Sequence, residues 1–241
     1  MKALRLHRWR VTPKQAVQIQ LKLRDRVEVT DRIPGICLVA GADVALDLER
    51  QIAIAGAILY RYPEMVEVER VWAKRPLRFP YVPGLLSFRE MPTLLAALAR
   101  LNNAPDLIFV EGHGISHPRR FGIASHLGVV LDCPTVGCAK SLLVGDVDEP
   151  EDRLGATSEL IHKEELIGYA VRTRIGVQPI FVSTGHRVSL KMAVKLALSV
   201  GDGFRVPKPT READKWVGKV KKTLTEPGKF DQIEPKIARP K

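Results

Sequence analysis

The chain has 241 residues, of which 45% are hydrophobic and 27% are charged, and this balance excludes an intrinsically disordered protein. Its formal net charge of +11 favours polyanionic partners such as nucleic acid, although cations spread over a solvated surface would give the same total. No apolar run is long enough to span a bilayer and the basic N-terminus lacks a signal peptide's apolar core, so we expect a cytoplasmic protein.

The apolar pattern predicts an N-terminal helix, three closely spaced strands and then alternating helices and strands. The helix spans residues 12–29, with Pro13 near its start. The strands at 36–46, 51–60 and 66–74 are joined by short turns, which indicates an antiparallel meander. The later elements expected are a helix at 91–101, a strand at 106–110, a helix at 121–131, strands at 135–139, 166–172 and 179–183, and helices at 188–200 and 211–223.

This order predicts an α/β fold in which a mixed central sheet with an antiparallel meander is flanked by helices. We expect a single domain over residues 1–225. Residues 226–241 are rich in Pro and Lys and have no periodicity, so they are expected to form a flexible basic tail. A turn is expected at 31–35, where Pro34 and Gly35 adjoin.

Three acidic residues stand in settings that suggest a cation site. Asp43 interrupts an apolar strand, where a carboxylate is costly unless it is paired or bound to a metal. Glu90 opens the helix after residues 88–89, and Glu111 ends the 106–110 strand. Carboxylates at strand ends can converge on a hard divalent cation. Alone, however, Glu90 is also an ordinary first-turn acid and Glu111 an ordinary solvated strand end.

Several polar residues are candidates for contacts with phosphate. Lys140 and Ser141 follow a strand, but the preceding residues lack the glycines of a phosphate-binding P-loop, so an NTPase is rejected. Lys140 can still place a point charge on a phosphate, or be an ordinary surface lysine. His117 and Arg119 belong to a polar, basic turn before the next helix, which is equally typical of a solvated cap.

Tyr81, Val82, Pro83 and Gly84 form a rigid turn that presents an aromatic side chain. Proteins that act on a base often push a side chain into the base stack and move the base out. A tyrosine beside a Pro-Gly turn is more often a packing residue, so this turn gains meaning only together with the other segments.

Taken together, these segments resemble the signature blocks of the endonuclease V family. The blocks are G-A-D-V-A at 41–45, Y-V-P-G-L-L-S-F-R-E at 81–90 and the long block at 106–140, with closing blocks at 179–187 and 209–214. They occur in family order, and the resemblance covers residues 18–213.

The resemblance implies a ribonuclease H-like fold and hydrolysis of the second phosphodiester on the 3′ side of deoxyinosine in DNA. It implies Mg²⁺, or Mn²⁺ in its place, held by metal-binding acids at Asp43 and Glu90, with Glu111 at the third acidic position. Further positions carried over are the strand-separating wedge at Tyr81, Val82, Pro83 and Gly84 and the base pocket at Leu85 and Gly112. Polar residues near the phosphate are His117 and Lys140, and His113 and Arg119 are further expected contacts with nucleic acid.

One departure from the family pattern affects the expected chemistry. The family usually has Asp in the D-G-H-G motif, whereas this chain has Glu111. The longer side chain leaves three outcomes open: normal activity, a preference for Mn²⁺, or lesion binding without cleavage. Inosine-containing RNA is an alternative substrate that no motif here separates from DNA, and a monomer is the default expectation.

Overall fold

This computed structural model describes residues 1–33 and 35–225, which are built around a mixed β-sheet. Its strands are β1 (Leu38–Asp47), β2 (Ile52–Arg61), β3 (Val66–Pro76), β4 (Leu107–Glu111), β5 (Thr135–Ala139), β6 (Thr157–His162), β7 (Glu165–Val171) and β8 (Ile180–His186). The helices are α1 (Pro13–Leu23), a short 3₁₀ turn η1 (Arg24–Arg26), α2 (Leu86–Leu98), α3 (Ile123–Leu131), α4 (Leu190–Ser199) and α5 (Lys208–Thr225). Pro34, within the predicted turn, and the predicted tail at 226–241 lie outside the described residues.

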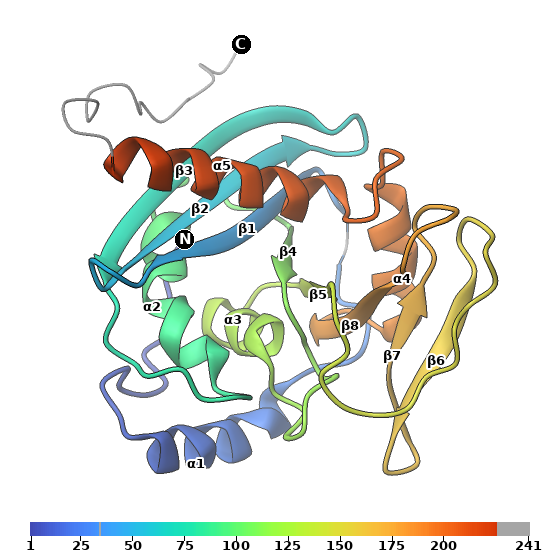
Figure 1. Ribbon diagram of the computed structural model, residues 1–241, viewed down its shortest axis with the longest axis horizontal. Helices are drawn as coiled ribbons and strands as arrows, with labels where there is room; N and C mark the ends of the chain where they lie inside the picture. The colour runs from blue at the N-terminus through green and yellow to red at the C-terminus, as the bar shows by residue number, and fades with distance from the viewer. Residues whose placement is uncertain (34, 226–241) are drawn as a thin grey trace.

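The strand order is β3-β2-β1-β4-β5-β8-β7-β6 (Figure 1). β1, β2 and β3 pair antiparallel, which confirms the predicted meander. β4 lies parallel to β1, and β5 lies parallel to β4, so the centre of the sheet is parallel and its two flanks are antiparallel. The mixed sheet predicted from the sequence is therefore confirmed.

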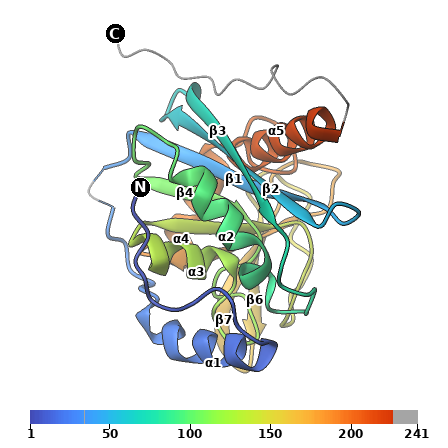
Figure 2. The ribbon, with the colours of Figure 1, turned by 90° about the vertical axis from the view of Figure 1, so that its left-hand side faces the viewer.

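Helices cover both faces of this sheet (Figure 2). On one face α2 and α3 pack over the meander and β4, around buried residues such as Leu94 and Leu127. On the other face α4 and α5 enclose a second core that contains Phe109 and Trp216. Trp216 also donates its indole N–H to Val71 O at 3.0 Å, which fixes α5 across β1–β3.

Three expected elements differ from those observed. The predicted helix at 12–29 ends at Leu23, because Glu28 leaves the helical path and forms backbone bonds with the end of β8, where Arg187 N donates to Glu28 O. The helix predicted at 91–101 begins at Leu86 and holds Pro92 inside it, so Glu90 lies within the helix instead of opening it. The edge strand β6 was not expected, because its exposed, polar sequence lacks an apolar run.

None of the helices formed by the described residues combines the length and the apolar character that crossing a lipid bilayer requires.

Candidate active site

The parallel centre of the sheet brings Asp43 and Glu111 together. Ala42 of β1 pairs with Val110 of β4, so the next residues along the two strands are Asp43 and Glu111. Side chains alternate between the two faces of a strand, so Asp43 lies on the same face as Gly41 and Glu111 lies on the same face as Phe109. Gly41 and Phe109 pair with each other, so all four residues share one face of the sheet. Both carboxylates therefore lie on the side of the sheet that α5 covers.

Helix α5 approaches this face closely enough to add a fourth acid. A Cβ atom at Gly41 would lie 2.0 Å from Pro209 O, so only glycine admits the first turn of the helix. One turn later the half-exposed Asp214 lies 3.5 Å from Lys140 Nζ and raises the pKa of Asp43. The sequence reading did not single out Asp214, because an acid on a strongly charged helix looks like an ordinary solvated residue.

Glu90 reaches the same cluster from α2, on the other side of the sheet. Burial, followed by the charges of Asp43 and Glu111, raises the pKa of Glu90 to about 8. Burial and then the charge of Glu111 likewise raise the pKa of Asp43 to about 7. The three predicted metal-binding acids thus meet at one place, and their mutual repulsion is only partly offset by the nearby Lys140 and Arg89.

Lys140 is the cation that contacts this cluster directly. It follows the end of β5, and its Nζ lies 2.9 Å from Glu111 Oε1. The other oxygen, Glu111 Oε2, is buried and has no hydrogen-bond partner. A buried carboxylate oxygen without a partner carries a free-energy cost that a bound cation would remove.

The donor chemistry of this cluster fits a hard divalent cation. Carboxylate oxygens are the ligands that Mg²⁺ and Mn²⁺ prefer, and the repulsion among Asp43, Glu90 and Glu111 is what a cation relieves. In the described residues, no three side chains of acids, histidines or cysteines yet lie close enough together to ligate an ion. Binding an ion would therefore require these side chains to draw together.

The raised pKa values predict how the metal-free protein responds to pH. The folded state holds protons on Asp43 and Glu90 that the unfolded chain releases near pH 4, so these groups lower the free energy of unfolding as pH rises from about 4 to 8. In EDTA, we expect Asp43→Asn to match the wild type at pH 4.5 and to exceed its stability by on the order of 2 kcal/mol at pH 8. Chemical denaturation across this range measures the difference. A constant difference would contradict the burial of a repelled carboxylate.

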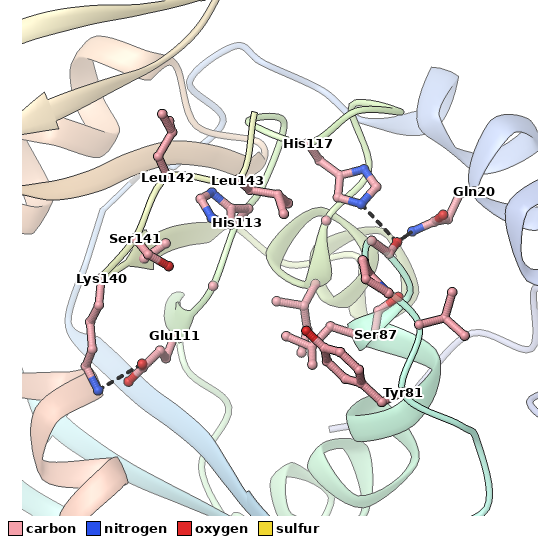
Figure 3. A pocket seen from close by; sticks show the side chains of 18 residues that line it. Gln20, Tyr81, Ser87, Glu111, His113, His117, Lys140, Ser141, Leu142 and Leu143 are labelled. Carbon is pink, nitrogen blue, oxygen red and sulfur yellow. Dashed lines mark hydrogen bonds and ion pairs between the residues drawn. The ribbon is translucent and has the colours of Figure 1, made fainter. Parts of the chain in front are cut away.

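A cavity of about 320 Å³ adjoins the acidic cluster. Figure 3 shows Glu111 and Lys140 on one side of it and Tyr81 with Gln20 and His117 on the other. Of the predicted base-pocket residues, Gly112 lines the cavity, and so does His113, a predicted contact with nucleic acid. The Leu85 side chain is instead buried beside Phe88, and its neighbour Leu86 lines the cavity. Sequence reasoning also missed Gln20, Ser87 and the half-exposed pair Leu142 and Leu143.

The predicted wedge, residues 81–84, is exposed at its tip and anchored at its base. Tyr81 is 72% exposed, whereas three nitrogen atoms converge on the carbonyl oxygen of Gly84. These are Gln20 Nε2 at 3.0 Å, His117 Nε2 at 3.0 Å and Arg119 Nη2 at 2.8 Å. Gly84 has φ +76°, and a Cβ there would lie 2.8 Å from Arg119 Nη2, so the convergence requires glycine.

Both ring nitrogens of His117 are engaged in this anchor. Nε2 bonds to Gly84 O, which requires it to be the protonated donor, and Nδ1 accepts from Arg119 N at 3.1 Å. Burial lowers the pKa of His117 to about 4, so the ring is neutral near pH 7. The pKa of His113 is also lowered to about 4 by burial, and its Nδ1 lies 2.9 Å from Ser116 Oγ.

Gln20 connects the anchor to the rest of the fold. Its Nε2 also donates to Phe121 O at 3.0 Å, and its Oε1 accepts from Arg119 Nε at 2.6 Å. Because Gln20 is 1% exposed, no water replaces these bonds when they are removed.

We expect Gln20→Met to lower kcat/KM by about 10-fold on the inosine-containing DNA that the resemblance implies as substrate, since the substitution leaves buried acceptors unpaired and frees the predicted wedge. Gln18→Met, at an exposed position on the same helix, is the matched control. Metal-induced thermal shifts should be the same in both variants. An unchanged kcat/KM for Gln20→Met would show that the wedge is held without it.

Comparison with known proteins identifies relatives along most of the chain. Residues 21–215 match the family model described as Endonuclease V. Endonuclease V of Gloeobacter violaceus is 44% identical over 223 residues, which are 91% of each chain. The crystal structure of Endonuclease V from Streptomyces avermitilis is 40% identical and superposes with a TM-score of 0.86 over 90% of this chain and 96% of that one.

A third relative was solved with a nucleic acid. Endonuclease V of Ciona intestinalis, in complex with a 24mer DNA containing an inosine followed by a ribo-adenosine, is 29% identical and has a TM-score of 0.76 over 88% of this chain and 98% of that one. These likenesses confirm the resemblance noted in the sequence and the ribonuclease H-like fold that it implied.

Proposed function

The chain belongs to the endonuclease V family of nucleases, and we propose that it is a metal-dependent endodeoxyribonuclease that cuts the second phosphodiester on the 3′ side of deoxyinosine, leaving 3′-hydroxyl and 5′-phosphate ends. The observation that carries this proposal is the meeting of an acidic cluster with a cavity of about 320 Å³ beside the exposed Tyr81. The relative from Ciona intestinalis that was solved with inosine-containing DNA supports the choice of substrate. We propose that this activity serves DNA repair in the cytoplasm and that the protein acts as a monomer.

Asp43, Glu90 and Glu111 are the residues that would hold Mg²⁺, or Mn²⁺ in its place, and the negative charge of Asp214 acts on Asp43 beside them. When bound, the ion supplies neutralising charge at the scissile phosphate and lowers the pKa of a water molecule. Each carboxylate serves this role best when ionised. Since the pKa values of Asp43 and Glu90 are raised to about 7 and about 8, metal affinity should rise with pH over this range.

Lys140 supplies positive charge next to the phosphate. Its Nζ is half-exposed and is held by Glu111 at 2.9 Å and Asp214 at 3.5 Å, so it is positioned at the edge of the acidic cluster. A fixed cation there stabilises the negative charge that builds up on the phosphate oxygens during hydrolysis. Its contact with two carboxylates also keeps Lys140 protonated, because they raise its pKa against the opposing effect of burial.

The wedge and the cavity would recognise the deaminated base. Tyr81, backed by Val82 and Pro83, would enter the base stack, and the extruded hypoxanthine would sit against Gly112 and His113. His117 and Arg119 act as positioning residues, since their side chains already bind Gly84 O and leave few donors for a phosphate. The cavity is at the small end of ligand pockets, which suits a single base.

The decisive experiment incubates the protein with end-labelled duplex DNA, single-stranded DNA and RNA, each carrying one inosine, in Mg²⁺ and separately in Mn²⁺. We expect the DNA to be cut one nucleotide beyond the inosine, with no product from matched strands that carry adenine. Stronger cutting of RNA would move the proposal to an inosine-specific ribonuclease. Intact strands in every reaction, from protein shown to be folded, would overturn the nuclease assignment.

A further inference from the structure

A second cavity, of about 290 Å³, lies on the opposite side of the wedge from the acidic cluster. The N-terminal segment reaches the loop after β3 here, beside the first turns of α2 (Figure 2). We call this second cavity the arginine pocket, after four residues that line it: Arg10, Arg75, Arg78 and Arg89. Its remaining lining is largely aromatic and apolar, and includes Trp9, Val11, Pro76, Phe79, Pro80, Phe88, Pro92 and Thr93.

Most of the positive charge of the arginine pocket has no carboxylate partner among the described residues. No acidic residue lines it, and no ion pair to a carboxylate involves any of its four arginines within the part of the chain that the structure describes. Other arginines of the protein are paired: those that contact carboxylates include Arg172, Arg187 and Arg211. Arg89 acts electrostatically on Glu90, so Arg10, Arg75 and Arg78 carry the positive charge that attracts an anion to this cavity.

Arg89 has a buried donor that no other described residue satisfies. Its Nη1 donates to Phe79 O at 2.8 Å, which ties the guanidinium to the segment before Tyr81. Its Nε is buried without a hydrogen-bond partner. Arg10, Arg75 and Arg78 are exposed at the mouth, so an anion can be contacted there without rearranging the core.

The same chain segment forms a wall of both cavities. Phe79 and Pro80 line the arginine pocket, and the next residues, 81–84, line the cavity beside the acidic cluster. Helix α2 repeats this division: Leu86 and Ser87 face the acidic side, whereas Phe88 and Arg89 face the arginine pocket. Tyr81, 72% exposed, therefore stands between an acidic and a basic site.

We propose that the arginine pocket binds the sugar-phosphate backbone of the strand opposite the deaminated base. This rests on the proposed function, in which Tyr81 separates the two strands of a duplex. One strand then passes to the side of Glu111 and Lys140, and its partner must pass on the other side of the wedge. Guanidinium groups form ion pairs and hydrogen bonds with phosphodiesters. The aromatic side chains of Trp9 and Phe79 in the pocket lining offer stacking partners to a base that has lost its neighbour in the duplex.

The test compares Arg75→Gln/Arg78→Gln with the matched control Arg61→Gln/Arg174→Gln, which removes two exposed arginines elsewhere. Fluorescence anisotropy in EDTA measures the dissociation constants of one inosine-containing strand, alone and annealed to its complement. We expect the first variant to bind the duplex about 10-fold more weakly and with a shallower salt dependence, because two phosphate contacts are lost. Single-strand binding, and both substrates in the control, should change by less than about 2-fold.

Equal losses on single-stranded and duplex DNA would place the cleaved strand in the pocket and overturn the proposal, as would no loss on either. A wild-type protein that binds the duplex but does not cut it would remove the nuclease assignment while leaving this comparison valid. A second readout uses a photoreactive thymidine in the complementary strand, opposite the inosine. Crosslinks should map to residues 9–11 or 75–80, and crosslinks only to residues 141–143 would contradict the assignment.

Discussion

An Asp43→Asn protein is expected to fold and to bind inosine-containing DNA, but to cut it at least about 10³-fold more slowly than the wild type, a loss of about 4 kcal/mol in transition-state stabilisation. The reason is that Asp43 occupies the middle of the acidic cluster, where it faces Glu111 across the β1–β4 pair and contributes to the raised pKa of Glu90. Its replacement removes one negative charge from the cluster without changing the size of the side chain.

Single-turnover cleavage rates measure this effect, with Asp148→Asn as the control because Asp148 is exposed and does not line the cavity beside the cluster. The same Asp43→Asn protein should lose most of the thermal stabilisation that Mn²⁺ gives to the wild type. Retained cleavage together with a retained metal shift would remove Asp43 from the metal site. Loss of cleavage with an unfolded circular dichroism spectrum would instead assign Asp43 a structural role.

The sequence predicted those acids whose surroundings made them unusual. Asp43 stood out because a carboxylate within an apolar strand needs a partner, and the structure places it beside three other acids. Glu90 was predicted too, but as the residue that opens its helix, whereas α2 begins at Leu86 and Glu90 lies within it. Asp214 was missed because it is one of many charged residues on α5. Its place near the cluster depends on the close approach of α5 to Gly41, which the local sequence does not reveal.

Contacts between distant segments could not be read from local patterns. Gln20 looked like part of a solvated helix face, yet it is buried against Gly84 and Phe121, which follow it by 64 and 101 residues. His117 and Arg119 looked like a basic cap that is free to touch phosphate, and tertiary packing directs both toward Gly84 O. Sequence reasoning predicted a wedge at residues 81–84 but not the contacts that hold its base at Gly84.

Glu111 is the residue for which a second large effect is expected. Glu111→Gln should cut at least about 10²-fold more slowly, because it removes a ligand charge from the cluster while keeping an oxygen near Lys140. In the wild type, an ion held by Glu111 would compete with Lys140 for this carboxylate, since Lys140 Nζ lies 2.9 Å from Oε1. Mg²⁺ demands strict ligand geometry, and the Glu111 carboxylate stands one methylene group further from the backbone than the usual Asp would place it.

Glu111→Asp shortens the side chain by one methylene group and draws the carboxylate back from Lys140. We therefore expect Glu111→Asp to cut well in Mg²⁺ and the ratio of its rates in Mn²⁺ and Mg²⁺ to fall by about 5-fold relative to the wild type. Rates in each metal at saturating concentration, together with metal titrations followed by thermal shift, separate metal affinity from turnover. An unchanged ratio would mean that the longer acid is accommodated by the backbone and does not select the metal. The other outcome is that the wild type binds inosine-containing DNA without cutting it, whereas Glu111→Asp cuts. The longer side chain would then have made this member of the family a lesion-binding protein, with Lys140 as the residue that holds the Glu111 carboxylate in the inactive position.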